Sequence, residues 1–206
     1  MRLPRLRAPG RIQRELLFVA AIGATIASAR SSLADHYVVP TGSMLPTVQL
    51  EDHVLVDKAA YGIRLPFAGG YAYYGAPPLR GDVVVLRSPE DGEVLLKRVI
   101  AVPGDRVSVI GGEVSINGAR MPIVERGGAW LEELGKVSHT ISLDDGGGPD
   151  YGPLALPDGK YLVLGDNRGN SKDGRWFGLV ARDAILGRVE GVILRHGSPT
   201  WVRLGR

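Results

Sequence analysis

The sequence predicts a mainly β protein, built from antiparallel sheets and preceded by an N-terminal helix that crosses a membrane. Beyond residue 37, short runs rich in Val, Ile and Leu end at Gly, Pro or Asp, as is typical of strands joined by tight turns. The 29 glycines and 14 prolines favour many turns over a helix bundle. An uncharged apolar run near the start predicts the helix.

The N-terminal segment carries most of the positive charge. Residues 1–15 hold five arginines and one glutamate, for a net charge of +4, whereas the whole chain carries +3. The remaining residues therefore sum to about −1, and a near-neutral body argues against a nucleic-acid-binding protein. With no cysteines, the chain has neither disulfides nor cysteine-based metal or redox chemistry.

The apolar run "LLFVAAIGATIASA" spans residues 16–29 and ends at Arg30. These 14 residues fall short of the roughly 20 needed to cross a bilayer, but continuing through Arg30 to Leu33 gives a plausible span if Arg30 extends its side chain to the interface. We expect a membrane anchor at 15–36, because an arginine-rich flank keeps the N-terminus in the cytoplasm and exports the rest. Residues 1–14 would then form a basic cytoplasmic tail.

Two other interpretations of this segment stay open. A cleavable signal peptide would also have a basic start and a short apolar centre, and Ala27-Ser28-Ala29 fits a cleavage site that the chain could cut itself. A buried core helix is the third possibility, which the clustered arginines disfavour.

The remainder, 37–206, is expected to be one catalytic domain. Strands are predicted at 81–87, 93–102, 105–118, 160–166 and 184–195, with a hairpin at Gly111-Gly112 and a turn at Asn117-Gly118. Stretches 62–81 and 143–159 are rich in Gly and Pro and predict loops, and a short helix is expected near 129–135. The region 108–158 is interpreted as a small β subdomain inserted between two core strands.

The stretch "VVPTGSMLPT" at 38–47 predicts a rigid loop that presents the hydroxyl of Ser43. A serine hydroxyl needs a base to become a nucleophile, and histidine is the usual one. His36, His53, His139 and His196 show no Ser-His-Asp order, and surface or structural roles fit them better.

A lysine can serve as the base if it is neutral, which requires burial and a pKa lowered to about 7–8. Lys97 suits this requirement, because it follows two leucines inside an apolar strand. The other lysines lie in polar or turn contexts, where a solvated charge is expected: Lys58, Lys136, Lys160 and Lys172.

Three blocks of the sequence resemble, in order, the sequence boxes of bacterial type I signal peptidases (leader peptidases), which are membrane-anchored Ser/Lys serine proteases. These are "VVPTGSMLPTVQLEDHVLVDKAAYGIRLPF", "GDVVVLRSPEDGEVLLKRVIAVPGDRV" and "LGDNRGNSKDGRWFGLV". Together they cover 74 of the 206 residues. The resemblance implies a signal-peptidase-like catalytic core that requires no cofactor or metal.

By position, the resemblance implies that Ser43 is the nucleophile and Lys97 the general base. Thr41 matches a hydroxyl residue that helps the Ser43 backbone N–H bind the oxyanion, and Ser171 matches a serine that orients the lysine. Supporting roles are implied for Asp166, Asn167, Arg168, Asp173 and Arg175, with Asp173 and Arg175 expected to pair.

The substrate implied is an exported preprotein, cut after an A-x-A-like site at the surface of the bacterial inner membrane. The peptide would dock as an added strand with side chains in two shallow apolar pockets. Pocket positions match Tyr37, Val39, Met44, Val48 and Leu96, for which ordinary core packing is an equal alternative. Partners are thus signal peptides and the lipid bilayer, with no nucleic acid, and the oligomeric state stays open.

Four positions depart from the family pattern, and Gly169, Lys172 and Gly174 among them replace more usual small or acidic residues. Glu51 stands where glycine is usual, and Lys172 follows Ser171, where a second cation would lower the pKa of Lys97 further. Alternative functions also stay open: a processing peptidase specialised for pilus or conjugation substrates, or an anchored β module that binds signal peptides without cutting them. A self-cleaving repressor relative is disfavoured, since the chain lacks a helix-turn-helix pattern.

Overall fold

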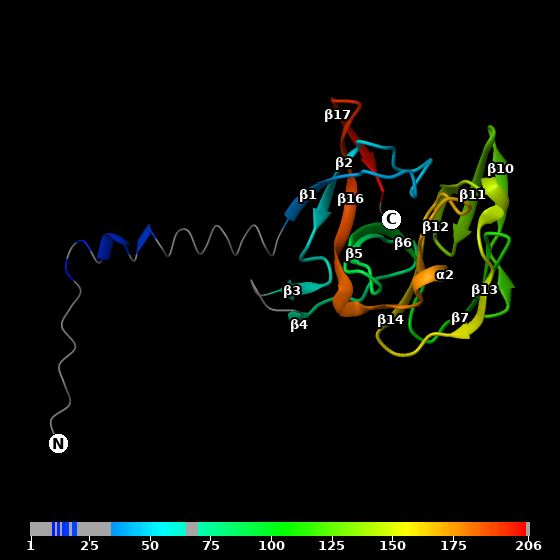
Figure 1. Cartoon of the computed structure of the whole chain (residues 1–206), viewed down its shortest axis with the longest axis horizontal. Coiled ribbons are helices and arrows are strands. Elements are labelled where there is room, and N and C mark those ends of the chain that lie inside the picture. Colours follow the sequence, from blue (N-terminus) through cyan, green and yellow to red (C-terminus); the bar gives the residue numbers. More distant parts are fainter. Residues whose placement is uncertain are drawn as a thin grey trace, which may run out of the picture.

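The computed structural model describes residues 34–64 and 70–204, together with Gly10, Ile12, 14–16, Phe18 and Val19. As predicted, the body is mainly β (Figure 1). Every pairing between its named strands is antiparallel. Among residues 34–64 and 70–204, helical structure is limited to α2 (Gly174–Phe177) and two 3-10 turns, Asp144–Gly147 and Arg182–Ala184.

The largest sheet contains the predicted strands 81–87, 93–102, 160–166 and 184–195. Its order is β1-β2-β16-β5-β6-β14-β15, and β17 also pairs with β16. The strands are β1 (Ala34–Val38), β2 (His53–Asp57), β5 (Val83–Arg87), β6 (Val94–Ala101), β14 (Lys160–Leu164), β15 (Val180–Ala181), β16 (Ile185–Arg195) and β17 (Ser198–Arg203). Register shifts along β16 bend the sheet around an apolar cluster that contains Val54, Val85 and Val189.

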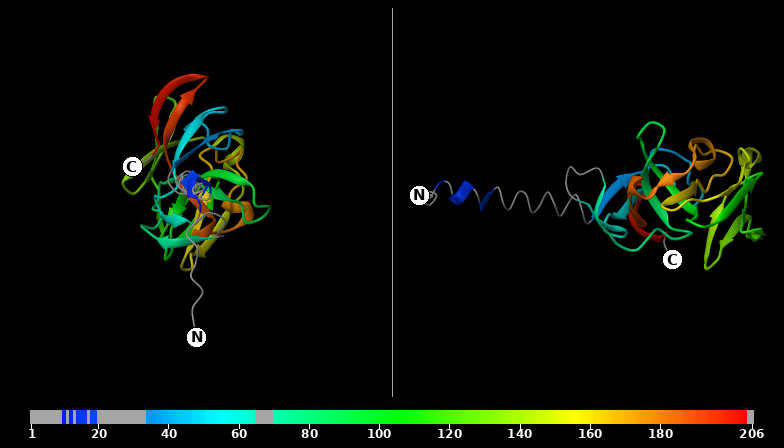
Figure 2. Two further views of the ribbon diagram at one scale, coloured as in Figure 1. Left: turned by 90° about the vertical axis from the view of Figure 1, so that its left-hand side faces the viewer. Right: turned by 90° about the horizontal axis from the view of Figure 1, so that it is seen from below.

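Two smaller sheets lie between β6 and β14 in the chain and sit together at one end of the body (Figure 2). One has the order β13-β7-β8-β9, with β7 (Arg106–Ile110), β8 (Glu113–Ile116), β9 (Ala119–Arg120) and β13 (Tyr151–Ala155). The other consists of β10 (Ile123–Arg126), β11 (Ala129–Leu134) and β12 (Val137–Ile141). The turns at Gly111-Gly112 and Asn117-Gly118 connect strands as predicted.

These smaller sheets share a hydrophobic cluster with the large sheet, because Val107 and Val114 pack with Ile100 and Leu162. β6 and β14 are also direct neighbours, so the intervening segment leaves and re-enters the large sheet at one place. The division at 108–158 into an inserted subdomain stays a prediction.

The prediction of a helix near 129–135 is wrong, because this segment forms strand β11. Its side chains alternate across the sheet: Glu132 and Leu134 are buried on one face, whereas Glu133 between them is exposed on the other. Alternation of this kind suits a strand, and tertiary packing here overrides the helix propensity of Ala, Leu and Glu.

The two predicted loops also contain strands. Within 62–81, β3 (Gly62–Arg64) and β4 (Tyr71–Tyr74) form a hairpin, and Tyr71 donates a hydrogen bond of 2.8 Å to the Ile185 carbonyl. Within 143–159, β13 pairs with β7. The Gly and Pro content of both segments predicts loops, and it hides short strand pairings that form only in the tertiary structure.

Most of the predicted anchor at 15–36, with Ala27-Ser28-Ala29, lies outside the described residues. Its last three positions, from Ala34 to His36, belong to strand β1, so the anchor prediction extends too far. Within the described part of the chain, no helix is both long and apolar enough to span a membrane.

Candidate active site

The loop that carries Ser43 follows β1 and is tied down by its backbone. The Val39 N–H donates to the Asp52 carbonyl over 2.9 Å, and the Val48 N–H donates to the Met44 carbonyl over 2.9 Å. Met44 and Val48 are fully buried, so their side chains fix the loop to the apolar cluster of the large sheet. The Ser43 side chain is left half-buried at the surface of this rigid loop.

Lys97 reaches Ser43 from strand β6. Its Nζ lies 2.7 Å from Ser43 Oγ and 3.0 Å from the Leu96 carbonyl oxygen. The side chain is only 3% exposed. The structure therefore brings together the two residues that the sequence analysis singled out as nucleophile and base.

Burial lowers the pKa of Lys97 from 10.5 to about 8, although the nearby carboxylates of Asp173 and Asp166 oppose the shift. Removal from water disfavours the charged ammonium, so the amine can be neutral near physiological pH. The prediction that Lys172 adds to this effect is wrong. Lys172 is exposed and its ammonium pairs with Glu90 over 2.7 Å.

Thr41 and Ser171 flank the pair differently. Thr41 Oγ1 lies 3.4 Å from Ser43 Oγ on the exposed side of the loop. Ser171 Oγ is buried and has no hydrogen-bond partner among the described residues, so the predicted bond to Lys97 is not formed. A Cβ at Gly165 would lie 2.3 Å from Ser171 Oγ and 2.4 Å from the Ser43 carbonyl oxygen, which places Ser171 close behind the Ser43 loop.

The remaining motif residues form buried ion pairs around the site. Asp173 pairs with Arg175 over 2.8 Å, as predicted, and Asp166 pairs with Arg98 over 2.7 Å. Arg168 is fully buried against Glu132. Arg98 and Glu132 were not singled out from the sequence. Arg98 directly follows Lys97, which is a signal that could have found it, whereas nothing local marks Glu132.

The histidines do not take part in the pair. His36 and His53 stack on β1 and β2 with ring centroids 6.0 Å apart, and His196 lies in a turn. His139 is buried, with Nε2 at 3.3 Å from Glu132 Oε2, although neither ring nitrogen has hydrogen-bond geometry. In the described part of the chain, no histidine has a hydrogen bond to Ser43.

A groove of about 240 Å³ opens beside Ser43 and Lys97. Tyr37, Val39 and Leu96 line it, as expected for pocket residues. Met44 and Val48 are fully buried in the cluster behind it and are not part of its lining, so for these two the core-packing alternative holds.

One wall of the groove is the first half of β6. Its residues 94–97 pair with β5, but the pairing with β14 begins only at Arg98. Among the described strands, this edge of β6 therefore has no neighbouring strand, so an extended peptide could add to it.

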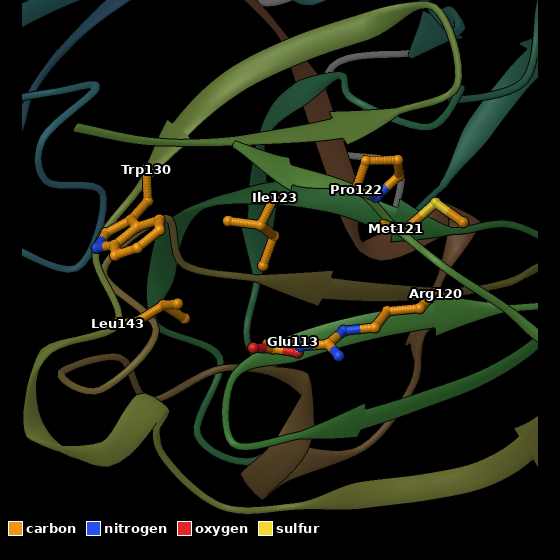
Figure 3. Close-up of a pocket in the computed structure, with 7 residues that line it drawn as sticks. All are labelled: Glu113, Arg120, Met121, Pro122, Ile123, Trp130 and Leu143. Atoms are coloured by element: carbon orange, nitrogen blue, oxygen red, sulfur yellow. The ribbon is translucent and has the colours of Figure 1, made fainter. Parts of the chain in front are cut away.

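A second cleft, of about 600 Å³, lies between the two smaller sheets (Figure 3). None of the site residues expected from the sequence lines it. Its walls are formed by Glu113, Arg120, Met121, Pro122, Ile123, Trp130 and Leu143.

The family model described as signal peptidase, peptidase S26, matches residues 12–194. The chain belongs to this family. The S26 peptidases are hydrolases of peptide bonds, so the chain is an enzyme of that class.

Several curated relatives of this chain are named signal peptidase I. A signal peptidase I of Pseudomonas aeruginosa is 36% identical over 82% of this chain and 68% of its own length. One from Pseudomonas fluorescens is 34% identical over the same shares, and one from Leptolyngbya laminosa is 33% identical over 82% of this chain and 75% of its own. A crystal structure of a signal peptidase I from Enterococcus faecalis is 28% identical, covering 55% of this chain and 97% of that one, with a TM-score of 0.38.

Proposed function

We propose that this S26 peptidase is a signal peptidase I that cuts exported preproteins after an A-x-A-like site. Ser43 is the nucleophile and Lys97 the general base. The observation that carries this proposal is the 2.7 Å approach of a buried lysine amine, with a pKa of about 8, to the Ser43 hydroxyl. A charged, solvated lysine could not accept the hydroxyl proton.

In the first half of the reaction, neutral Lys97 takes the proton of Ser43 Oγ as this oxygen bonds to the scissile carbonyl carbon. The carbonyl oxygen becomes an oxyanion, which the Ser43 backbone N–H and the Thr41 hydroxyl stabilise. Lys97 then gives its proton to the leaving amine, the C–N bond breaks, and an acyl-enzyme remains. Water attacks this ester while Lys97 accepts one of its protons, and Lys97 then returns that proton to Ser43 Oγ as the ester C–O bond breaks and the carboxylic acid product is released.

The free edge of β6 supports binding of the precursor as an added strand, with its scissile carbonyl next to Ser43. The groove between Tyr37, Val39 and Leu96 is small and mainly apolar, which favours alanine-sized side chains before the cut. Met44 and Val48 support this groove from behind rather than touching the peptide.

The proposed location is the extracytoplasmic side of the bacterial inner membrane. The basic tail at 1–14 and the apolar run at 16–29 support a single-pass anchor with a cytoplasmic N-terminus. An anchor confines enzyme and precursor to one surface, which raises their effective concentration.

The test is cleavage of a preprotein by the full chain, with the cut mapped by mass spectrometry. We expect one cut after an A-x-A-like site by the wild type and none by Ser43→Ala or Lys97→Ala. Lys136→Ala, which changes an exposed lysine of the smaller sheets, is the control and should cleave fully. Full processing by either site variant would exclude the Ser/Lys pair, and binding without any cleavage by the wild type would indicate a binding module. Cleavage of pilin-type substrates alone would indicate the specialised peptidase.

A further inference from the structure

The peptide bond between Gly42 and Ser43 is held from one side by Asn167. The Asn167 side-chain Nδ2 donates to the Gly42 carbonyl over 3.2 Å, and the Asn167 backbone N–H donates to the Ser43 carbonyl over 3.1 Å. These two bonds fix the carbonyls on both sides of the Ser43 backbone.

A peptide unit is planar and trans, so its N–H points opposite to its C=O. Fixing the Gly42 carbonyl toward Asn167 therefore turns the Ser43 N–H away from Asn167. In the proposed mechanism this N–H binds the oxyanion, and such a donor is effective only when it points at the developing charge. Asn167 thus sets the direction of the Ser43 N–H without donating to the oxyanion itself.

Asn167 is in turn held by the residue that follows it. The Arg168 N–H donates to the Ser142 carbonyl over 2.9 Å, and the Arg168 carbonyl accepts from the Arg175 guanidinium over 2.6 Å. The Arg168 guanidinium donates to the Gly112 carbonyl over 2.6 Å and also donates to both carboxylate oxygens of Glu132.

Glu132 comes from β11, outside the three motif blocks, and its side chain is fully buried. Burial would raise the pKa of Glu132, but Arg168 and His139 outweigh it and hold the pKa at about 2. The Glu132 carboxylate is therefore charged, and its removal would leave the Arg168 guanidinium buried without its counter-charge, which is strongly destabilising locally.

We infer that Asn167 is a positioning residue that aims the Ser43 backbone N–H at the oxyanion, and that Glu132 of β11 keeps Asn167 in place through Arg168. The inference rests on the proposed function, since it assumes that Ser43 attacks a carbonyl. It adds to the reaction two residues that touch neither substrate nor the reacting atoms.

The test compares two probes of the same site. A peptide aldehyde is attacked by Ser43 Oγ and gives a hemiacetal whose oxygen occupies the oxyanion position, whereas an uncut peptide bound to a Ser43→Ala background has no such charge. For Asn167→Ala and Asn167→Asp we expect aldehyde affinity and kcat to fall by about 10-fold or more. The KM, and the Kd of the uncut peptide, should stay within about twofold of the wild type.

Two outcomes would contradict the role of Asn167, and a third would contradict the proposed function. Equal losses for the aldehyde and the uncut peptide would show that Asn167 only maintains the groove, and unchanged affinity for both would show that it does nothing to the donor. Absence of cleavage by the wild type would overturn the proposed function itself, which distinguishes that failure from failure of the inference.

The second link is tested with neighbouring glutamates. Glu132→Gln removes the buried charge, whereas Glu133→Gln changes the exposed residue beside it on the same strand. We expect only Glu132→Gln to reduce kcat and aldehyde affinity, and Glu132→Asp, which keeps the charge, to recover part of the loss. Thermal unfolding shows whether each variant is folded. A folded Glu132→Gln or Glu132→Asp variant with the full kcat of Glu133→Gln would contradict this link.

Discussion

The amine of Lys97 and the hydroxyl of Ser43 lie 2.7 Å apart although 54 positions separate them in the chain. Lys97 belongs to β6 and Ser43 to the loop after β1, and these strands are joined only through β2, β16 and β5 of the large sheet. The pair is therefore a product of the whole sheet, and its chemistry is open to direct tests.

The pH dependence of cleavage should follow the lysine. Because burial lowers the Lys97 pKa to about 8, the neutral base accumulates as pH rises through that value. We expect kcat to rise with a midpoint near pH 8 and then level off, as measured on a peptide substrate. Lys172→Ala should have the same midpoint, because the Lys172 ammonium pairs with Glu90 rather than acting on Lys97. A shifted midpoint in that variant would restore a role for Lys172.

The same lysine should cost stability below its folded pKa. Its ordinary pKa is 10.5 and its folded pKa about 8, so the unfolded chain binds more protons between these values. The free energy of unfolding should therefore rise between pH 8 and 10.5. Below pH 8, Lys97 is protonated in both states and adds no pH dependence. The difference corresponds to roughly 3 kcal/mol at pH 7. Lys97→Met should recover a large part of it in the free energy of unfolding, measured with denaturant, and a loss of stability would contradict the expectation.

Thr41 is expected to act through its hydroxyl. Thr41→Val keeps the shape of the side chain but removes the donor, and losing one oxyanion donor costs on the order of 10²–10³ in kcat. Thr41→Ser keeps the donor and should retain most of the activity. Initial-rate kinetics on one peptide decide the point: similar kcat values for both variants would remove Thr41 from the reaction.

Ser171 separates a structural role from a functional one. Its buried Oγ lacks a hydrogen-bond partner among the described residues, so Ser171→Ala removes an unsatisfied polar group. We expect the free energy of unfolding to stay equal or rise by up to about 1 kcal/mol. If Ser171 orients Lys97 during the reaction, kcat should nevertheless fall, by at least about 10-fold. Unchanged kcat would show that the lysine needs no help from this serine.

Glu51 occupies a conformation that suits glycine. Its φ is 63°, in the left-handed region that costs a residue with a Cβ about 1–2 kcal/mol. Glycine avoids this cost but loses more entropy on folding, so Glu51→Gly should stabilise the chain by roughly 0.5–1 kcal/mol. A rise in the melting temperature with unchanged kcat is expected. Glu51→Ala, which keeps a Cβ, should not show it.

Strand positions and the central pair were predictable because their signals are local. The runs of β-branched residues around β5, β6, β14 and β16 needed only alternation and turn chemistry, and Lys97 stood out as a charge inside an apolar strand. Buried partnerships between distant residues were not predictable in this way.

Glu132 shows why. The segment around it predicts a helix, because Ala, Leu and Glu are good helix formers. Its inward direction depends on Arg168, 36 positions away, which supplies the opposite charge inside the protein. Ser171 shows a different limit of sequence-based prediction. The motif implies that Ser171 lies near Lys97, but it does not determine whether the two side chains form a hydrogen bond.

The two smaller sheets leave the large one where β6 ends and return where β14 begins, and Ala101 lies opposite Leu162 at that point. Evolution can lengthen or trim such an excursion without moving the strands on either side. Glu132 restricts this freedom, because a relative that lost β11 would leave the buried guanidinium of Arg168 without its carboxylate partner. Shortened descendants should therefore either recruit another anion from elsewhere or exchange Arg168 for a neutral side chain, a paired change that can be looked for wherever the excursion is reduced.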